Sequence, residues 1–599
     1  MQSRSYVIVF LTLYLIYLCA YYALTFSSCN DLELPLSISI QDMINKAKDG
    51  DVVPVPPGTY VENIRINKSI KLVAEGVVNI LPLDPNTHVV EVISDNVTLQ
   101  GFSIKGPVGV LKSGIYVGRA SRCHILSNNV FNCSYFGIYV VDSRDILLSG
   151  NLVTSSEFGI YIFMSRDGAI VNNDLSLNKY GLTVSECSNI TVRKDSLENN
   201  IFGVYLHSSN FNYVTENVIN FNQRAISVIS SQGNEISSNE ISNNNYGVLV
   251  DSSRDNKIFE NVFLDNKIGI YIFNSEYNTI FKNNISYGDN NVYAEKSRDL
   301  LISNNSLRFA KNSLVIDFCH NVSALQNLLE NALGNGLTSF RSEGCRVIEN
   351  SLRLNKIGIS LDSSANYTID KNLIELNEYG IYLHHSSDNL ILRNRCLRNS
   401  VAAFYSDGVS KDNIIRNLEV NSCNVLTNLT FSYFGEISIN ELRSVQGANS
   451  NLRFLGACFN FTILTPRSWM LINLSYNPSD LVGSGKSAPS LYLWTGAKWE
   501  PATESTSLSL PDGRYISTRL KEPGTYAMLV ELPATEKGSS MDLYFLSATF
   551  ALVLVSVLFI FRKRILKSIK SYLVFLRGFN SKFEYNGSGS SHFLGISRR

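Results

Sequence analysis

Acidic and aromatic residues recur at fixed positions of a repeated phrase, and these residues are the best placed to act on a ligand. The phrase reads GIYV at Gly114 and Gly137 and GIYI at Gly159, and it returns about every 22 residues up to a worn copy, AAFY, at Ala402. Alternate side chains of a strand face opposite sides. The apolar second and fourth residues should therefore point inward, and the third and fifth should form an outward stripe two residues wide.

Three carboxylates on this stripe are candidates for catalysis. Glu295 and Asp317 lie one repeat apart, and Asp362 lies two repeats further on. If successive repeats stack as neighbouring strands, the first two residues lie ~5 Å apart. Like charges this close raise the pKa of one carboxyl, as in glycosidases with paired carboxylates. The enzyme that these residues would make is a glycoside hydrolase or a polysaccharide lyase.

The same stripe could instead bind carbohydrate without acting on it. Outward rings at a regular rise could stack on sugar faces, and polar groups between them could bond hydroxyls. A structural role competes, because tyrosine is favoured in strands and outward acids keep a repeat protein soluble. The sequence favours binding over catalysis and leaves a purely structural role open. The residues predicted to bind are Tyr205, His207, Asp251, Tyr271, Phe273, Tyr293, Phe340, Tyr382 and His384.

Each repeat holds two or three short apolar runs with strand character, separated by Asn, Ser, Asp and Gly. No window between these turns is long enough for a helix of 3.6-residue period. Three short strands in ~22 residues is the size of one coil of a parallel β-helix. We therefore predict an all-β solenoid of ~14 coils, in which each coil contacts only its neighbours.

Two series of asparagines keep the same period. One runs from Asn129 through Asn151 and Asp195 to Asn417, and a second occupies 178–266 and 355–399. Stacked amides can bond the residues above and below them, so we interpret both series as structural ladders. The glycine that opens most phrases is expected to serve a backbone conformation that a Cβ would strain.

The segment before the repeats resembles a known family. It contains a predicted helix at Ile40 to Ala47, GD before a strand, PPGTY, and then K-S-I-K-L-V ahead of a glycine. This arrangement resembles the start of NosD-like right-handed β-helix proteins, which belong to the pectin-lyase-like group of carbohydrate-binding and sugar-hydrolase repeats. The resemblance covers about 36–420 and implies a right-handed β-helix, with the short helix as a cap over its open end. It is specific for the fold and not for an activity.

NosD-like proteins are associated with copper-centre maturation, but the sequence does not support a copper role. Its seven His and six Met are scattered, and only His384 and His385 are adjacent. No CxxC motif is present, which argues against a zinc or redox site. We predict no metal site and no cofactor. Two cysteine pairs about one coil apart could form bridges: Cys319 with Cys345, and Cys396 with Cys423.

Hydrophobic segments at both ends indicate a single-pass membrane protein with its bulk outside the cell. Basic residues from Arg562 onward place the C-terminal end in the cytoplasm. The phrase LYLWTGAKWEP resembles membrane-proximal domains of prokaryotic, especially archaeal, surface proteins. The predicted organisation is a signal peptide or anchor (1–28), N-terminal cap and first coils (35–96), β-helix (97–424), β-sandwich (425–533), linker (534–540), transmembrane helix (541–561) and basic cytoplasmic tail (562–599).

Composition and sequons indicate the partners. Lys plus Arg equals Asp plus Glu at 52 each, so no net field attracts nucleic acid. The expected partners are the membrane and a polysaccharide or cell-envelope protein. Eleven N-x-S/T sequons suit an exported glycoprotein, although an Asn- and Ser-rich repeat makes some by chance. They begin at Asn67, Asn96, Asn132, Asn189, Asn284, Asn304, Asn321, Asn366, Asn428, Asn460 and Asn473.

Overall fold

The computed structural model describes residues 39–422, 425–442, 451–482, 488–502, 505–510 and 513–533. The segments predicted as signal or anchor, linker, transmembrane helix and cytoplasmic tail lie outside these residues. Within the part of the chain that is described, no helix is long and apolar enough to cross a bilayer.

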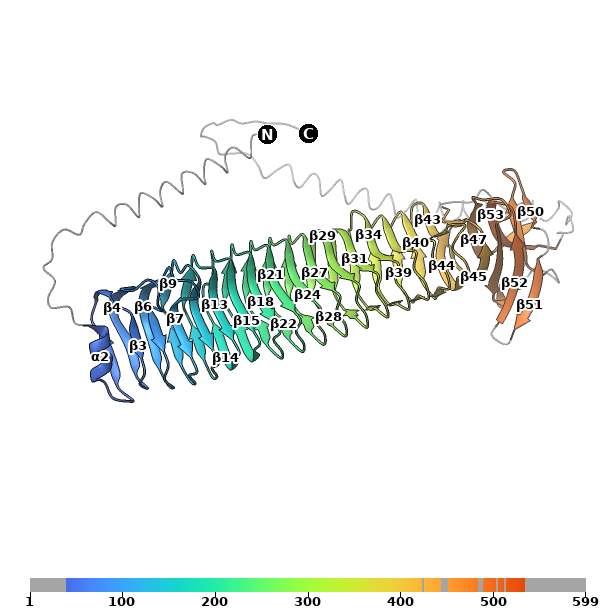
Figure 1. Cartoon of the computed structure of the whole chain (residues 1–599). Coiled ribbons are helices and arrows are strands. Elements are labelled where there is room, and N and C mark those ends of the chain that lie inside the picture. The colour runs from blue at the N-terminus through green and yellow to red at the C-terminus, as the bar shows by residue number, and fades with distance from the viewer. Residues whose placement is uncertain are drawn as a thin grey trace, which may run out of the picture. The chain divides into compact units, whose positions relative to one another are not determined.

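The chain folds into a right-handed parallel β-helix of about 17 turns, and Figure 1 shows its coils stacked one on the next. The strands form three columns. The first column begins with β1 (Val52–Val55) and ends in β44 (Ile414–Ser422), and the second begins with β2 (Gly58–Val61). The total exceeds the ~14 coils counted from the repeated phrase, and the first coils, which the sequence predicted within 35–96, begin at Val52.

The third column carries the repeated phrases, and its strands pair in parallel with an unchanged register. Tyr271, for example, lies between Leu249 of the preceding coil and Tyr293 of the next. The column consists of β3 (Ile64–Ile66), β5 (Val90–Val92), β7 (Ser113–Gly118), β10 (Phe136–Val141), β13 (Phe158–Phe163), β15 (Tyr180–Ser185), β18 (Phe202–His207), β21 (Arg224–Ile229), β24 (Tyr246–Asp251), β27 (Ile268–Phe273), the ends of β29 (Asn284–Glu295) and β31 (Ser306–Asp317), β34 (Asn335–Phe340), β37 (Ile357–Asp362), β40 (Tyr379–His384) and β43 (Ala402–Ser406).

Aliphatic side chains fill the interior, and the phrase glycine lets neighbouring coils approach closely. Ile138 and Val140 are fully buried. A Cβ placed on Gly137 would lie 2.5 Å from the carbonyl oxygen of Gly159 in the next coil. Gly137 does not have a left-handed backbone. The expectation of a special backbone conformation was therefore wrong, and the glycine is required by the contact between coils.

Buried asparagines form the predicted ladders. Oδ1 of Asn261 accepts from the backbone N–H and the Nδ2 of Asn239, both at 2.9 Å, and Nδ2 of Asn261 donates to the carbonyl of Ile236 at 2.9 Å. Each amide thus satisfies buried polar groups in neighbouring coils. The remaining members of this first ladder are Asn128, Asn151, Asn173, Asp195, Asn217, Asn283, Asn305, Asn327, Asn350, Asn372 and Asn394.

Three details of the ladders differ from the sequence prediction. The first member is Asn128 rather than Asn129, because 23 residues separate it from Asn151. Asn417 is exposed and has a φ of 54°, so it does not continue the series. A third ladder was not predicted, and it links Asn212, Asn234, Asn256 and Asn278.

Both open ends of the β-helix are covered, which prevents pairing of exposed edges with other chains. Helix α2 (Ile40–Lys46) buries Ile40 and Ile44 over the first coils, as predicted. At the other end β44 and β43 pair antiparallel with β45 (Val425–Phe434) and β46 (Ile437–Asn440). The antiparallel strands continue as β47 (Leu452–Ile463), β48 (Trp469–Tyr476), β49 (Ser490–Trp494), β50 (Trp499–Pro501), β51 (Thr506–Leu510), β52 (Gly513–Leu520) and β53 (Gly524–Glu531).

The predicted bridge between Cys319 and Cys345 is not formed. Both residues are buried free thiols, and Cys396 is also a free thiol. Cys423, its proposed partner, lies outside the described residues. Burial raises the pKa of Cys123, Cys133 and Cys187 to about 11, so these thiols stay protonated at neutral pH.

Candidate functional site

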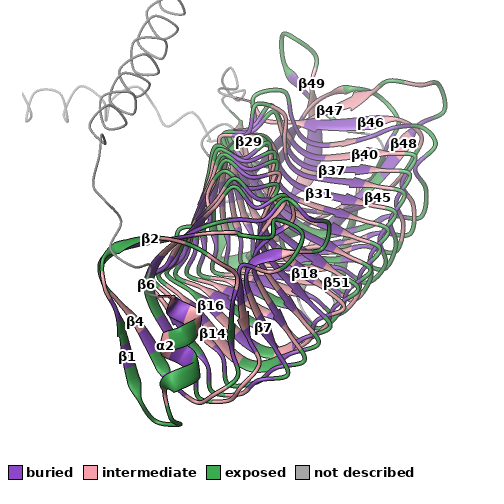
Figure 2. Ribbon diagram, turned by 60° about the vertical axis from the view of Figure 1, so that its left-hand side comes forward, coloured by how far each residue is buried: buried purple, intermediate pink, exposed green. Residues whose placement is uncertain are grey.

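The outward side chains of the third column form the stripe that the sequence predicted. In β27 Ile270 and Ile272 are buried, whereas Tyr271 and Phe273 are half-buried on the opposite side. The same alternation occurs in β10, β13, β18 and β40 (Figure 2), whereas in β15, β21, β24, β34 and β37 the small or aliphatic third residue of the phrase is also buried. We call these outward residues, from Tyr116 to Tyr405, the stripe. Every residue predicted to bind or catalyse lies on it.

Several of the predicted binding residues stack on one another. The rings of Tyr271 and Tyr293 lie 5.1 Å apart at an angle of 17°. Tyr205 stacks on His207 with centroids 6.0 Å apart, and Tyr382 stacks on the Tyr405 ring at 4.5 Å. Stacked rings hold each other's orientation, so the stripe offers preformed aromatic surfaces rather than freely rotating side chains.

A second row of rings, which the sequence reasoning missed, runs beside the stripe. It occupies the residue before the phrase glycine. Phe136 and Phe158 lie 5.4 Å apart, and Tyr180 lies 4.6 Å from both Phe158 and Phe202. Arg224 then lies over the Phe202 ring at 5.2 Å. The signal was present in the sequence as FGIY, FGIY, YGLT and FGVY, one residue before the positions that were considered.

Glu295 and Asp317 are in register in adjacent coils, as predicted, and each has its own partners. Glu295 accepts a hydrogen bond from the Tyr271 hydroxyl at 2.5 Å and lies 3.5 Å from Nζ of Lys296. Asp317 receives two hydrogen bonds from the Arg341 guanidinium, at 2.9 and 3.2 Å. The arrangement is a row of acid–tyrosine and acid–arginine pairs.

The tyrosines of this row remain hydrogen-bond donors at neutral pH. Burial raises the pKa of Tyr293 to about 12, and the charges of Glu295 and Asp317 act in the same direction. Burial and the hydrogen bond to Glu295 also raise the pKa of Tyr271. Both hydroxyls donate to carboxylates, Tyr271 to Glu295 at 2.5 Å and Tyr293 to Asp317 at 3.4 Å, and neither can act as a base without a large energetic cost.

The structure separates Asp362 from the other two catalytic candidates. Phe340 lies between Asp317 and Asp362 in the register of the stripe. Asp362 instead contacts His384, with 3.3 Å between Oδ1 and Nδ1. Asp251 lies two coils from Glu295, and its carboxylate accepts from the Ser252 hydroxyl at 2.8 Å. The predicted acids therefore do not converge on one point.

An open polar groove follows the turn that leaves the stripe. Its wall includes Ser252 and Asn274, which directly follow the stripe residues Asp251 and Phe273. Arg254 and Glu276 bring opposite charges to its lining, and the Arg254 guanidinium donates to the Gln232 side chain at 3.1 Å. Rings on one side and hydroxyls, amides and charges on the other form a surface with the mixed character of ligand sites. The lining residues are Asn210, Ser230, Ser231, Gln232, Ser252, Ser253, Arg254, Asn274 and Glu276.

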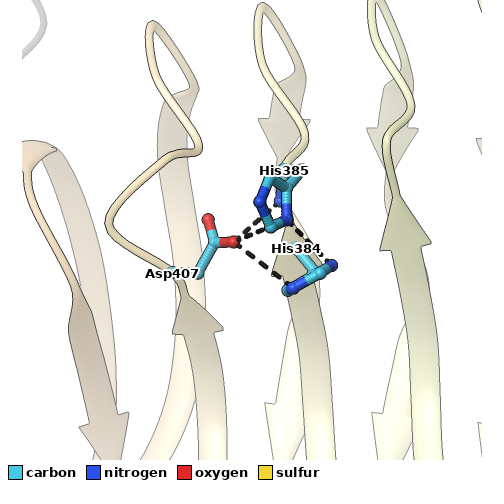
Figure 3. A group of neighbouring side chains, drawn as sticks. All are labelled: His384, His385 and Asp407. Atoms are coloured by element: carbon cyan, nitrogen blue, oxygen red, sulfur yellow. Dashed lines mark hydrogen bonds and ion pairs between the residues drawn. The ribbon is translucent and has the colours of Figure 1, made fainter.

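At the C-terminal end of the stripe two histidines meet an aspartate from the next coil (Figure 3). Oδ2 of Asp407 lies 3.3 Å from Nδ1 of His385 and 3.8 Å from Nε2 of His384. The sequence reasoning noted the two histidines and missed Asp407. The repeat could have found it, because Asp407 follows His385 by 22 residues, one coil.

The asparagines fall into two environments. Those of the ladders are buried, whereas the asparagine of nine sequons is exposed. Asn460 and Asn473 are half-buried in β47 and β48. Exposed sequons suit attachment of a bulky glycan, and glycosylation stays a prediction.

A capped right-handed parallel β-helix with an outward aromatic and acidic stripe defines the class of this protein. The chain belongs to the NosD family, since the family model described as "Periplasmic copper-binding protein (NosD)" matches residues 85–179, 159–300 and 269–430. A stretch of 100 residues is 33% identical to a cell surface glycoprotein of Methanothermus fervidus. That stretch is 16% of this chain and 16% of the relative.

Solved structures with a similar fold share little sequence with this chain. The mannuronan C-5 epimerase A-module of Azotobacter vinelandii is 16% identical, with a TM-score of 0.33 over 44% of this chain and 92% of that one. A family 28 exopolygalacturonase of Yersinia enterocolitica is 11% identical, with a TM-score of 0.32 over 51% and 72%. A pectate lyase is 14% identical, with a TM-score of 0.28 over 44% and 71%.

Proposed function

We propose that this protein is a cell-surface β-helix that binds an extended polysaccharide along its stripe. The observation that carries the proposal is the row of rings and acids around Tyr271, Tyr293 and Glu295, which continues into a polar groove. A sugar ring has an apolar face and a rim of hydroxyls. Stacked rings suit the face, and the Glu295 carboxylate and the groove's amides and hydroxyls suit the rim.

The placement of the protein is part of the same proposal. The described domain lies outside the cell, anchored by the apolar segment 541–561, and the antiparallel strands β45–β53 form a small sandwich-like domain. The exposed sequons and the surface glycoprotein among its relatives support this placement.

A screen of the full-length chain against a panel of polysaccharides tests the proposal, with retention and product release scored together. We expect retention without products, and we expect the double variant Tyr271→Ala/Tyr293→Ala to lose most of it. Tyr213 is the matched control, because it is 41% exposed in β19 (Tyr213–Thr215), outside the stripe.

The same screen separates the alternatives. Product release that disappears in Glu295→Gln would identify a hydrolase or lyase, and the acid–tyrosine pair at Glu295 is the observation that favours that second function. If the panel gives neither retention nor products, the stripe does not bind polysaccharide. An envelope protein partner or a structural role would then replace the proposal.

The family description names copper binding, and the side chains of this protein show which copper ion they could bind. Cu(I) prefers sulfur ligands. The seven cysteines of the described residues are buried, and burial raises the pKa of Cys319 to about 12. Protonated, buried thiols are poor metal ligands. A site for Cu(I) does not fit these cysteines, whereas the imidazole and carboxylate groups near Asp407 suit a divalent ion.

A further inference from the structure

We infer that His384, His385 and Asp407 bind a divalent transition-metal ion of the Zn²⁺ and Cu²⁺ class. The three side chains come from two adjacent coils, and one ligand atom of each lies within 4.8 Å of the others. Imidazole nitrogen and carboxylate oxygen are the donors that such ions accept. The sugar contacts proposed at Tyr271, Tyr293 and Glu295 use none of these atoms, so the two proposals can fail separately.

The spacing of the ligand atoms fits one small ion. With bonds of ~2.0–2.1 Å, two ligands of a tetrahedral Zn²⁺ lie ~3.3 Å apart. Oδ2 of Asp407 lies 3.3 Å from Nδ1 of His385 and 3.8 Å from Nε2 of His384. All three ligand atoms lie within 4.8 Å of one another, so the imidazole rings have to turn toward the aspartate for all three to bind one ion.

Asp407 is held in a fixed orientation with one oxygen turned toward the histidines. Its Oδ1 accepts from the backbone N–H and the hydroxyl of Ser410, at 2.8 and 2.6 Å. Its Oδ2 accepts from the backbone N–H of His385 at 2.9 Å. The position of the carboxylate is therefore fixed before any ion arrives.

The hydrogen bond between coils at Asp407 differs from the equivalent hydrogen bonds in the two preceding coils. The amides of Arg341 and Ser363 donate to the backbone carbonyls of Asp362 and His384 in the next coil, each at 2.9 Å. The amide of His385 occupies the corresponding position, but it donates to the Asp407 carboxylate, also at 2.9 Å. A side chain thus replaces a backbone partner, which sets a carboxylate beside both imidazoles.

Asp362 acts as a positioning residue for His384. Its Oδ1 lies 3.3 Å from Nδ1 of His384, and the same nitrogen lies 3.0 Å from Nδ1 of His385. A carboxylate that holds one ring nitrogen fixes the tautomer and presents the other nitrogen to the metal. The His384 and His385 side chains are 43% and 48% exposed, so solvent reaches the site and water can complete the coordination.

Equilibrium dialysis of the full-length chain against Zn²⁺, followed by elemental analysis, tests the site. We expect one Zn²⁺ per chain, displaced by Cu²⁺ and not by excess Ca²⁺, which prefers oxygen ligands. His385 is exposed, so the His385→Ala variant should keep its fold. This variant should lose the ion. Asp362→Asn should weaken binding about tenfold.

His320→Ala is the matched control, since His320 is an exposed histidine four coils away from Asp407 in the stack. It should retain the ion. A second readout is the visible absorption of Co²⁺ bound in place of Zn²⁺, which reports tetrahedral nitrogen and oxygen ligands. The inference is overturned if no ion is retained, if Ca²⁺ displaces it, or if His385→Ala binds Zn²⁺ as tightly as the unaltered chain.

Discussion

The inward and outward sides of the third column follow different rules. Inward positions hold aliphatic residues in coil after coil, as at Ile138, Ile160 and Leu182. The outward neighbours change from Tyr161 to Thr183 at the same step. The interior must fill one repeated cross-section and satisfy buried amides, so it is uniform. The outward side chains have no such constraint, so they can vary from coil to coil and determine what the protein binds.

Removal of one ladder amide from the interior should lower the free energy of unfolding more than any other substitution considered. In Asn261→Ala the Asn239 amides and the Ile236 carbonyl lose their partners while buried. Each such group costs about 1–3 kcal/mol, so we expect a loss of about 5 kcal/mol in the free energy of unfolding, measured by urea denaturation. Asn220→Ala, at a half-buried asparagine outside the ladder, should cost about 1 kcal/mol. Equal losses would show that the ladder is not a special element.

The ladder contains one titratable residue, and its effect should depend on pH. Asp195 is 1% exposed, and its Oδ2 has no hydrogen-bond partner. In the neighbouring coils the Nδ2 atoms of Asn173 and Asn217 occupy the equivalent position, and each donates to a backbone carbonyl. Burial raises the pKa of the Asp195 carboxyl from 3.8 to about 7. The folded chain therefore holds this proton more tightly than the unfolded chain.

The sign of the pH effect follows from that difference. The stability that Asp195 contributes is fully present below pH 3.8 and is lost as the pH rises to about 7. Three pKa units correspond to about 4 kcal/mol at most. Asp195→Asn should therefore raise the urea midpoint at pH 8.5 and change it little at pH 4. The exposed neighbour Asp174 provides a control, and a gain for Asp195→Asn that does not vary with pH would contradict this reasoning.

Substitutions on the stripe should affect stability least. Arg341→Gln removes the ion pair to Asp317, but the Arg341 side chain is 52% exposed, and such pairs contribute about 0.2–1 kcal/mol. We expect the urea midpoint to fall slightly, by less than one fifth of the effect of Asn261→Ala. A loss of several kcal/mol would mean that the stripe is also part of the framework.

The repeat made the fold predictable from sequence. Constant spacing of the phrases predicted the coil, the inward and outward faces and the two asparagine ladders, because stacking repeats those contacts every 22 or 23 residues. The two ends of the β-helix were harder to predict from the sequence. Coils before Gly114 lack the phrase, and the pairing of β45 and β46 with the last coil joins segments outside the period.

The sites were less predictable because they depend on side-chain partners. Sequence spacing put Glu295 beside Asp317, but it did not reveal that Tyr271 and Arg341 engage them. The pairing of His385 with Asp407 was available from the period, yet it required a search across coils rather than along the chain. The role of Gly137 also depended on a neighbour, the carbonyl of Gly159 in the next coil.

The measurement that tests the central claim most directly is the affinity of the full-length chain for a polysaccharide that it retains, compared with that of the Tyr271→Ala/Tyr293→Ala variant. Removal of two stacked rings should weaken binding at least about tenfold, or 1.4 kcal/mol, with the urea midpoint nearly unchanged and with Tyr213→Ala behaving like the unaltered chain. Unchanged affinity in the double variant would contradict the assignment of binding to the stripe.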